Sequence, residues 1–179
     1  MMEQNTAAEN LIRIVPITEV HDLTSFSCSE EELNDFLETD ALTDHNNLYS
    51  ITRLVYYKDT LVGFFTLIAD NISVKSISPS DYANYHYSKL PAVKIACLAV
   101  DKRYERQGIG RLIITEIFSI VYQVSQNIGC RVITVDAKEH ALGFYKKFAF
   151  MEVASKKHQE NIPMYLDFLT LMKKGLNPK

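Results

Sequence analysis

The sequence has little glycine or proline and no long apolar run, and each shortage excludes a class of protein. Six glycines and five prolines in 179 residues argue against a collagen-like or extended disordered chain. No window approaches the roughly 18 consecutive apolar residues of a transmembrane helix. The opening segment Met1–Asn10 is polar and lacks the basic-then-apolar order of a secretion signal. We therefore expect a cytoplasmic protein that has no membrane partner.

Cysteine is also scarce, and its spacing supports neither a metal site nor a disulfide framework. The three cysteines are Cys28, Cys97 and Cys130, an odd number with wide spacings and no CxxC pair. The five histidines are scattered without the spacing of metal ligands. We predict that the protein binds no metal.

The chain does contain enough apolar material for one core, together with an uneven charge. Hydrophobic residues make up 47% of it, which favours a single domain over residues 1–179. The net charge is −3, but residues 1–90 carry 5 Lys or Arg against 14 Asp or Glu, while residues 91–179 carry 14 against 8. A basic C-terminal half suits a polyanionic ligand, and a solvated surface with chance asymmetry is an equally good explanation.

Apolar periodicity predicts strands and helices in alternation. Ser29 followed by acidic residues is typical of a helix N-cap, and Leu33, Phe36 and Leu37 then form one apolar face. Further helices are expected at residues 40–47, 108–127 and 139–148, and a long loop at residues 72–90. Strands are expected at residues 11–17, 50–57, 61–69, 92–100, 131–135, 150–154 and 163–169. This order predicts an α/β fold with a mixed central sheet of six to seven strands and flanking helices.

The most informative segment leads from the buried strand at Leu98 through a basic turn into the helix after Gly108. Gly108 and Gly110 carry no side chain, so backbone amides there can approach a ligand closely. The helix N-terminus adds unpaired N–H groups and the positive end of a dipole, which favour a pyrophosphate. Arg106 and Arg111 would add positive charge. The glycine pair alone also suits any tight strand-to-helix junction, and neither GxxxxGK[ST] nor GxGxxG is present.

Two motifs in this order resemble the GNAT superfamily of N-acetyltransferases. The glycine turn resembles the acetyl-CoA signature Q/R-x-x-G-x-G/A, with Glu105 at the usual Gln or Arg and Arg106 beside it. The later run from Ala141 to Phe150 resembles the family's A-x-x-F-Y-x-x-x-G-F, with Ala149 in place of glycine. The resemblance covers roughly residues 50–169.

The resemblance implies the GNAT fold, in which two central strands, here residues 92–100 and 131–135, are splayed apart. It also implies acetyl-CoA as the cosubstrate and a backbone N–H near the end of the first of these strands as the oxyanion donor. Arg103 is a candidate for contact with a terminal phosphate. The residues expected to bind the cofactor are Leu98, Ala99, Val100, Arg106, Gln107, Gly108, Ile109, Gly110, Arg111, Ala141 and Phe144.

Tyr145 matches the tyrosine that serves as general acid in this family. The acetyl group passes directly from the thioester to an amine, and the leaving thiolate benefits from a proton donor. Tyrosine hydroxyls stay protonated at neutral pH, because their pKa in model peptides is about 10. The alternative is a packing role beside Phe144, Phe148 and Phe150. The resemblance favours the catalytic role.

Two further groups of residues are candidates for a chemical role. Asp136, Glu139 and His140 lie near the second motif, but no base for the incoming amine can be identified among them. Cys97 lies on the central strand, where it could form an acyl-cysteine. No histidine can be placed beside it, and we expect a buried structural thiol.

The acceptor is less clear from sequence. The segment from Phe26 to Ala41 resembles the F-x-C-G…L-D-x-F-L…A opening of the GNAT branch that contains toxins acetylating aminoacyl-tRNA. Ser29 stands there for glycine, Cys97 for a frequent arginine, and the acidic net charge is unlike that of an RNA binder. We therefore expect an acetylase of a small-molecule or protein primary amine.

Two alternatives stay open at this point. The first is the toxin, with an antitoxin and tRNA as partners. The second is a non-catalytic domain that binds CoA or a partner, for which Glu105 and Ala149 are the only support. A homodimer is compatible with each of these readings.

Overall fold

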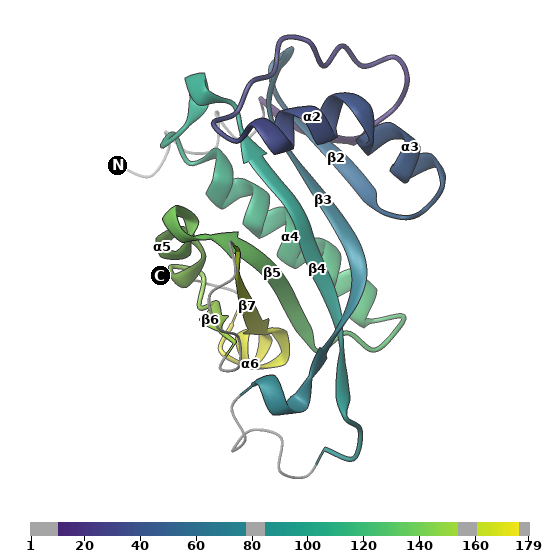
Figure 1. Cartoon of the computed structure of the whole chain (residues 1–179), viewed down its shortest axis with the longest axis vertical. Helices are drawn as coiled ribbons and strands as arrows, with labels where there is room; N and C mark the ends of the chain where they lie inside the picture. Colours follow the sequence, from purple (N-terminus) through teal and green to yellow (C-terminus); the bar gives the residue numbers. More distant parts are fainter. Residues whose placement is uncertain (1–10, 78–84, 154–160, 176–179) are drawn as a thin grey trace. The chain divides into compact units, whose positions relative to one another are not determined.

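The computed structural model describes residues 11–77, 85–153 and 161–175 (Figure 1). The polar opening at residues 1–10, the centre of the expected long loop at 78–84 and the expected strand end at Ala154 lie outside these residues. The strands and helices are β1 (Ile12–Pro16), α2 (Glu31–Thr39), α3 (Ala41–Asn46), β2 (Ile51–Tyr57), β3 (Thr60–Ser73), η1 (Val74–Ser76), β4 (Lys89–Val100), η3 (Lys102–Tyr104), α4 (Ile109–Ser125), β5 (Val132–Lys138), η4 (Glu139–Ala141), α5 (Leu142–Lys146), β6 (Met151–Glu152), β7 (Asn161–Asp167) and α6 (Phe168–Lys173).

Among the described residues, these elements form the expected mixed sheet, with seven strands in the order β1-β2-β3-β4-β5-β7-β6. The chain divides into two compact units, Met1–Ile68 with Ala96–Phe118, and Ala69–Ile95 with Ser119–Lys179. β3, β4 and α4 each contribute residues to both units.

The first unit is built on the antiparallel pairing of β1, β2 and the first part of β3. Helices α2 and α3 pack on one face of these strands (Figure 1), where Leu37 and Ala41 join Leu54 and Phe64 in the core. The other face receives α4 at Gly63. A Cβ at Gly63 would lie 2.8 Å from the Ala99 carbonyl oxygen and 3.2 Å from Ile113 Cδ1, so glycine is required for this approach.

Helix α2 has the expected amphipathic face but not the expected N-cap. Leu37 is buried, and Leu33 and Phe36 pack against the same core. The prediction of Ser29 as N-cap is wrong, because Glu30 occupies that position without a side-chain cap. The Ser29 hydroxyl instead donates a hydrogen bond to Glu105 Oε1 at 2.9 Å.

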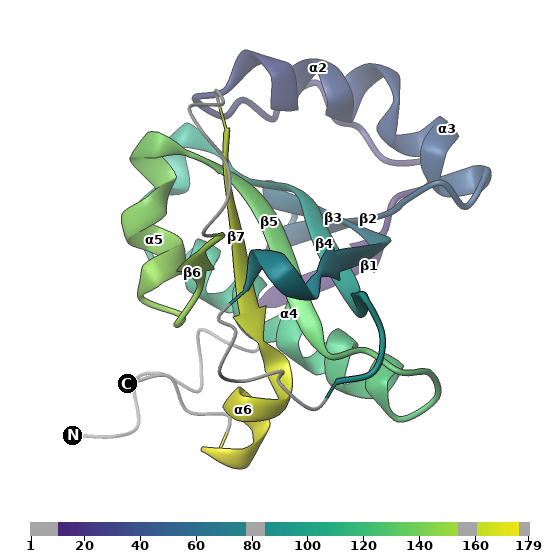
Figure 2. The ribbon, with the colours of Figure 1, turned by 60° about the horizontal axis from the view of Figure 1, so that its bottom comes forward.

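The second unit contains the parallel part of the sheet. β4 pairs with β5 from Ala92↔Val132 to Ile95↔Val135, and β5 pairs antiparallel with β7 along its whole length. β6 pairs with β7 on the far side, and Figure 2 shows β5, β7 and β6 side by side. One cluster of buried residues in this unit comprises Ile77, Leu90, Ala92, Val132 and Tyr165.

The ladder between β4 and β5 is much shorter than the strands that form it. Pairing ends at Ile95 and Val135, whereas β4 continues to Val100 and β5 to Lys138. The two central strands are therefore paired over only part of their length, which confirms the expected splay.

The last expected strand ends earlier than predicted. Residues 163–169 were expected to be extended, but β7 ends at Asp167 and α6 follows at once (Figure 2). The Asp167 carboxylate accepts a hydrogen bond from Thr170 N and so caps this helix. The apolar run through Leu169 is thus partly helical, since short apolar runs suit both structures.

Candidate active site

The basic turn leads from β4 into α4 through unusual backbone conformations. Gly108 has φ +87°, and its missing Cβ would have no heavy atom within 4 Å. Arg106 has φ +59°, a left-handed conformation that costs a residue other than glycine about 1–2 kcal/mol. Such strain is concentrated at ligand sites. The Gly108 carbonyl accepts the hydrogen bond from Leu112 N at 3.1 Å, so the first N–H groups of α4 have no partner within the helix.

A groove of about 780 Å³ lies beside this helix N-terminus in the first unit. Four residues of the expected cofactor-binding set line it, namely Gln107, Gly108, Ile109 and Arg111. The other lining residues are Ile12, Tyr57, Tyr104, Leu112, Thr115 and Glu116. The structure therefore places part of the predicted set on one accessible surface with two tyrosine rings.

The remaining residues of the predicted set lie on several elements. Leu98, Ala99 and Val100 form the end of β4, and Ala99 is buried in the core of the first unit. Arg106 is exposed in the turn, and Gly110 lies in the first turn of α4. In the second unit, η4 and α5 carry the last two residues, Ala141 and Phe144.

Arg103 and Asp101 anchor the basic turn. Arg103 Nε and Nη2 donate to the two Asp101 carboxylate oxygens at 2.8 Å each, and Nη2 also donates to the Ser25 carbonyl oxygen at 2.8 Å. Asp101 is only 1% exposed and also accepts a hydrogen bond from Ser27 N at 3.2 Å. The Arg103 hydrogen bonds hold the pKa of the Asp101 carboxyl below its usual range.

These bonds tie the turn to the segment that precedes α2, and the sequence analysis did not foresee them. Glu105 takes part in the same connection through Ser29, at the position where the family pattern has Gln or Arg. Gln107 Nε2 donates to the Arg103 carbonyl oxygen at 2.9 Å and tightens the turn itself. The sequence could have indicated a capping role for Asp101, because an acidic residue is typical of the position before a helix. In the structure, Asp101 does cap η3.

Tyr145 lies on α5 and is 6% exposed. Its ring packs edge-on against Phe144 and Phe150, with centroids 5.2 and 5.4 Å away. Ala149 has φ +66°, so it adopts the left-handed conformation that suits the glycine of the family pattern. The turn after α5 is thus left-handed at this position despite the alanine.

Cys97 has the properties of a structural thiol. Burial raises its pKa to about 11, against a smaller opposing effect of a hydrogen bond with Thr66. The thiol therefore stays protonated at neutral pH, and the thiolate needed for a covalent step is scarce. The hydroxyl of Thr66 also lies 2.8 Å from that of Thr52, in a buried polar pair.

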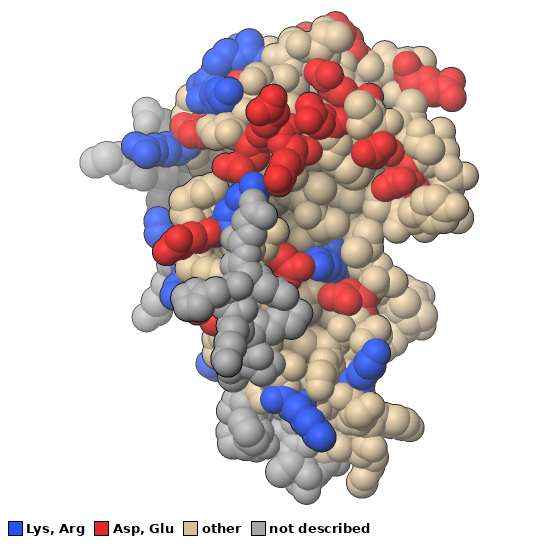
Figure 3. Space-filling view, in the orientation of Figure 1, with Lys and Arg blue, Asp and Glu red and all other residues tan. Residues whose placement is uncertain are grey.

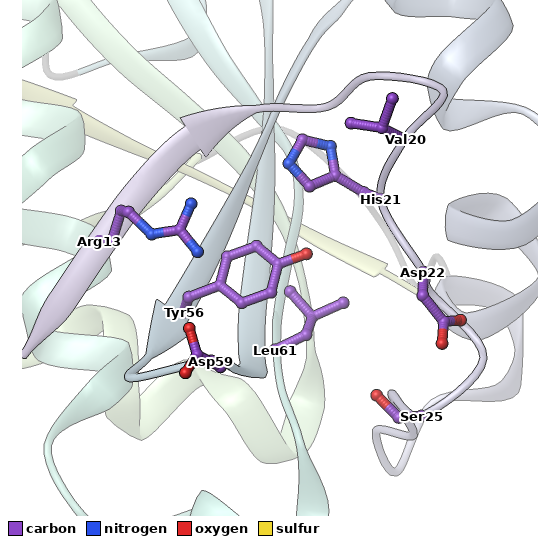
Figure 4. A pocket seen from close by; sticks show the side chains of 8 residues that line it. All are labelled: Arg13, Val20, His21, Asp22, Ser25, Tyr56, Asp59 and Leu61. Carbon is purple, nitrogen blue, oxygen red and sulfur yellow. The ribbon is translucent and has the colours of Figure 1, made fainter.

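A smaller pocket of about 270 Å³ lies in the first unit, and its lining includes no residue of the predicted site (Figure 4). The Arg13 Cζ lies 4.9 Å from the centroid of the Tyr56 ring, over its face. The centroid of the His21 ring lies 5.9 Å from that of Tyr56. Burial raises the pKa of Tyr56. Asp22 and Asp59 also line the pocket, so charges of both signs meet there. No spacing rule marks these residues in the sequence.

Within residues 11–77, 85–153 and 161–175, no three His, Cys, Asp or Glu side chains come together as metal ligands. In the same part of the chain, no helix has the length and apolar character needed to cross a membrane.

The structure combines a mixed sheet, whose central parallel pair is only partly paired, with a glycine turn at the start of a long helix, where an anion such as a pyrophosphate can bind. Comparison with known proteins gives the family. The chain belongs to the acetyltransferase (GNAT) domain family, whose model matches residues 19–166. It is therefore an N-acetyltransferase, as the sequence motifs implied.

Individual relatives are similar over most of the chain. A tRNA-acetylating toxin of Mycobacterium tuberculosis (strain ATCC 25618 / H37Rv) is 28% identical over 135 residues, which span 75% of this chain and 81% of the relative. A tyrosine-to-phenylalanine variant of KacT has a TM-score of 0.84 at 23% identity, covering 92% of this chain and 99% of KacT.

AtaT is also similar in fold. The structure of AtaT with acetyl-methionyl-tRNAfMet gives a TM-score of 0.82 at 24% identity, covering 91% of this chain and 98% of AtaT. A tyrosine-to-phenylalanine variant of AtaT, bound to acetyl-CoA and the C-terminus of the antitoxin AtaR, gives a TM-score of 0.75 at 22% identity over 93% of this chain and 99% of AtaT.

Proposed function

We propose that this N-acetyltransferase acetylates the amino group of aminoacyl-tRNA and acts as the toxin of a toxin–antitoxin pair. The observation that carries the proposal is the similarity to a tRNA-acetylating toxin over 75% of the chain. The structure of AtaT with acetyl-methionyl-tRNAfMet is consistent with it. The partners would then be tRNA and an antitoxin comparable to AtaR.

The proposed roles of individual residues follow the chemistry of acyl transfer. The N-terminus of α4, with Gly108 and Gly110, holds the pyrophosphate of acetyl-CoA, and Arg106 and Arg111 add positive charge. Backbone N–H groups at the end of β4 stabilise the oxyanion as the amine attacks the thioester carbon. The C–N bond forms and the C–S bond breaks. Tyr145 gives its proton to the departing thiolate, while the proton lost by the amine passes to water.

A second candidate function is acetylation of a small-molecule or protein amine. The surface charge of α2 favours it, because Figure 3 shows acidic side chains gathered over this helix. Negative charge there repels tRNA phosphates and would attract a cationic acceptor. The exposed acids of α2 and its C-cap are Glu31, Glu32, Asp35, Glu38 and Asp40.

We also propose that residues 1–179 act as one functional domain in the cytoplasm, since the family model spans residues 19–166 and charged tRNA is a cytoplasmic substrate. A homodimer is the oligomeric state that we propose to test by light scattering.

The test is acetyl transfer by the purified protein from acetyl-CoA to charged tRNAs and to a panel of small amines and peptides. We expect turnover on charged tRNA, and Tyr145→Phe should lower kcat by about 10²–10⁴, because one general acid contributes that much. The variant loses only a hydroxyl, so its melting temperature and acetyl-CoA affinity should stay close to those of the wild type. Turnover on small amines alone would select the second candidate. A Phe variant with wild-type single-turnover rates would remove Tyr145 from the mechanism.

A further inference from the structure

The groove beside the start of α4 has an aromatic wall that the glycine turn does not account for. Tyr57, at the end of β2, and Tyr104, in η3, both line the groove, and both are half-buried. Their ring centroids lie 6.5 Å apart, with the ring planes inclined at 57°. This distance is close to the outer limit of about 7 Å for an aromatic pair, so their mutual packing is a weak explanation for the two rings. Because both rings line the groove, a planar group within it can contact both.

Each of these rings has a cation over its face. Lys58 Nζ lies 5.6 Å from the centroid of the Tyr57 ring, and Arg103 Cζ lies 5.9 Å from that of Tyr104. Both distances are within the range of a cation–π contact. Among the described residues that line the groove, Glu116 is the only acid. Aromatic rings with cations beside them suit a nucleotide, because the base stacks on the ring while the positive charge attracts the phosphate.

The groove follows α4 from its start, on the side that faces the first strands of the sheet. Gly108, Leu112 and Glu116 line it at every fourth residue, so they lie along one side of the helix. On the other wall, Ile12 pairs with Tyr57 in the ladder between β1 and β2. The volume of about 780 Å³ is within the range of roughly 300–1,000 Å³ that is usual for small-molecule sites. A groove of this size that begins at the glycine turn has room for a nucleoside.

We propose that this groove binds the adenine base of acetyl-CoA, an inference that rests on the pyrophosphate site proposed at the start of α4. In acetyl-CoA, the pyrophosphate lies between the acetylated pantetheine arm and the adenosine. With the pyrophosphate at Gly108, these two parts leave the turn in different directions. The arm extends to the end of β4, where the proposed oxyanion donors lie, and the adenosine enters the groove, which also begins at Gly108.

The two tyrosines then decide which acyl donor is bound. Tyr104 stacks on the base, and Tyr57 contacts it from the side of the sheet. Lys58 and Arg103 place positive charge beside these rings, which suits the phosphate that CoA carries on its ribose. Donors that lack the adenosine make none of these contacts, so the groove selects acetyl-CoA against them.

The test is a calorimetric titration with two acyl donors that differ in the nucleotide. S-acetyl-4′-phosphopantetheine keeps the acetylated arm and one phosphate but lacks the adenosine. Tyr104→Leu should raise the Kd of acetyl-CoA by about 5- to 100-fold, the effect of losing one stack between a base and an aromatic ring. The same variant should leave the Kd of the phosphopantetheine donor within about 2-fold of the wild type, because that donor has no base. Tyr104→Phe keeps the ring, so its acetyl-CoA Kd should be far closer to that of the wild type.

The matched control is Tyr122→Leu, the same exchange at a tyrosine of α4 that is 45% exposed and does not belong to the described lining of the groove. It should leave both Kd values unchanged. Should Tyr104→Leu fail to fold, Tyr57→Leu replaces it with the same expected difference between the two donors. These titrations need no acceptor, so their result does not depend on which amine is acetylated.

Equal losses of affinity for the two donors would overturn the inference, because they would mean that the Tyr104 ring serves only the shape of the turn. An unchanged acetyl-CoA Kd in a folded Tyr104→Leu protein would also overturn it, and a higher KM for charged tRNA in that variant would assign the groove to RNA. A wild-type protein that binds no acetyl-CoA would instead reject the proposed pyrophosphate site, and this inference with it.

Discussion

At the scale of single residues, Ala149 combines an ordinary side chain with a backbone conformation that glycine adopts more easily. Its φ of +66° brings the Cβ close to the following carbonyl oxygen, which disfavours this region for every L-residue with a side chain. The hydrogen bonds around it enforce the turn, since Ala149 N donates to the Lys146 carbonyl oxygen at 3.1 Å and Phe150 N to that of Tyr145 at 3.3 Å. The conformation is therefore imposed by the motif that carries Tyr145.

Ala149→Gly should stabilise the protein by about 1 kcal/mol, because the strain of the left-handed conformation disappears and exceeds the entropy cost of glycine. The melting temperature should rise by roughly 2–4 °C. The matched control is Ala137→Gly, an identical exchange inside β5 at a residue without positive φ, which should lower the melting temperature. A fall in stability for both variants would show that the left-handed conformation of Ala149 does not lower the free energy of unfolding.

At the scale of elements, the turn between β4 and α4 is hydrogen-bonded to the segment before α2 and is exposed at Gly108. Asp101, Arg103 and Glu105 fix it to the segment before α2, while a Cβ at Gly108 would meet no heavy atom within 4 Å. Charge, more than size, should therefore decide which side chain is tolerated at position 108.

Gly108→Asp should weaken acetyl-CoA binding at least about 100-fold, because the new carboxylate repels the negatively charged pyrophosphate. In the wild type, the positive end of the α4 dipole favours an anion at this position. The matched control is Gly108→Asn, which has nearly the same shape, tolerates positive φ and carries no charge. By calorimetry, the acetyl-CoA Kd of Gly108→Asn should be much closer to that of the wild type than the Kd of Gly108→Asp. Equal affinities for the Asp and Asn variants would argue against a phosphate site at this turn.

At the scale of the whole molecule, the dominant feature is the separation of charge along the chain. Residues 1–90 carry 14 acidic against 5 basic side chains, and residues 91–179 carry 8 against 14. The acidic part includes the surface of α2 seen in Figure 3. A tRNA acceptor would have to make its phosphate contacts with the basic part, and such contacts release counterions.

Acetylation of charged tRNA at saturating acetyl-CoA should therefore lose at least about tenfold in kcat/KM between 50 and 200 mM salt, as expected for a few phosphate contacts. Acetylation of a small amine should change much less, because it releases few counterions. Steady-state rates over this salt range measure both. A tRNA reaction without salt dependence would show that the acceptor end alone is recognised.

The sequence by itself determined the class of fold and the position of the main motifs. Periodicity located the hairpin of β2 and β3, the long helix α4 and the buried central strand, because each is strongly periodic or continuously apolar over many residues. The glycine turn and Tyr145 could be predicted as site residues because their motifs consist of residues close together in the chain, and their roles stay predictions. The ends of elements were predicted less accurately: Ser29 is not the N-cap of α2, and the strand expected to reach Leu169 ends where α6 begins.

Only the tertiary structure decided which distant residues meet. The partners of Arg103 and Glu105, and the pairing of Lys94 with Asp136, join segments whose separation in sequence carries no signal. Single charged residues leave no periodic pattern, and whether an acid is buried, paired or free depends on the fold around it. The strained conformation of Ala149 is likewise invisible in the sequence, since alanine is most often helical and only the closed turn forces it into the left-handed region.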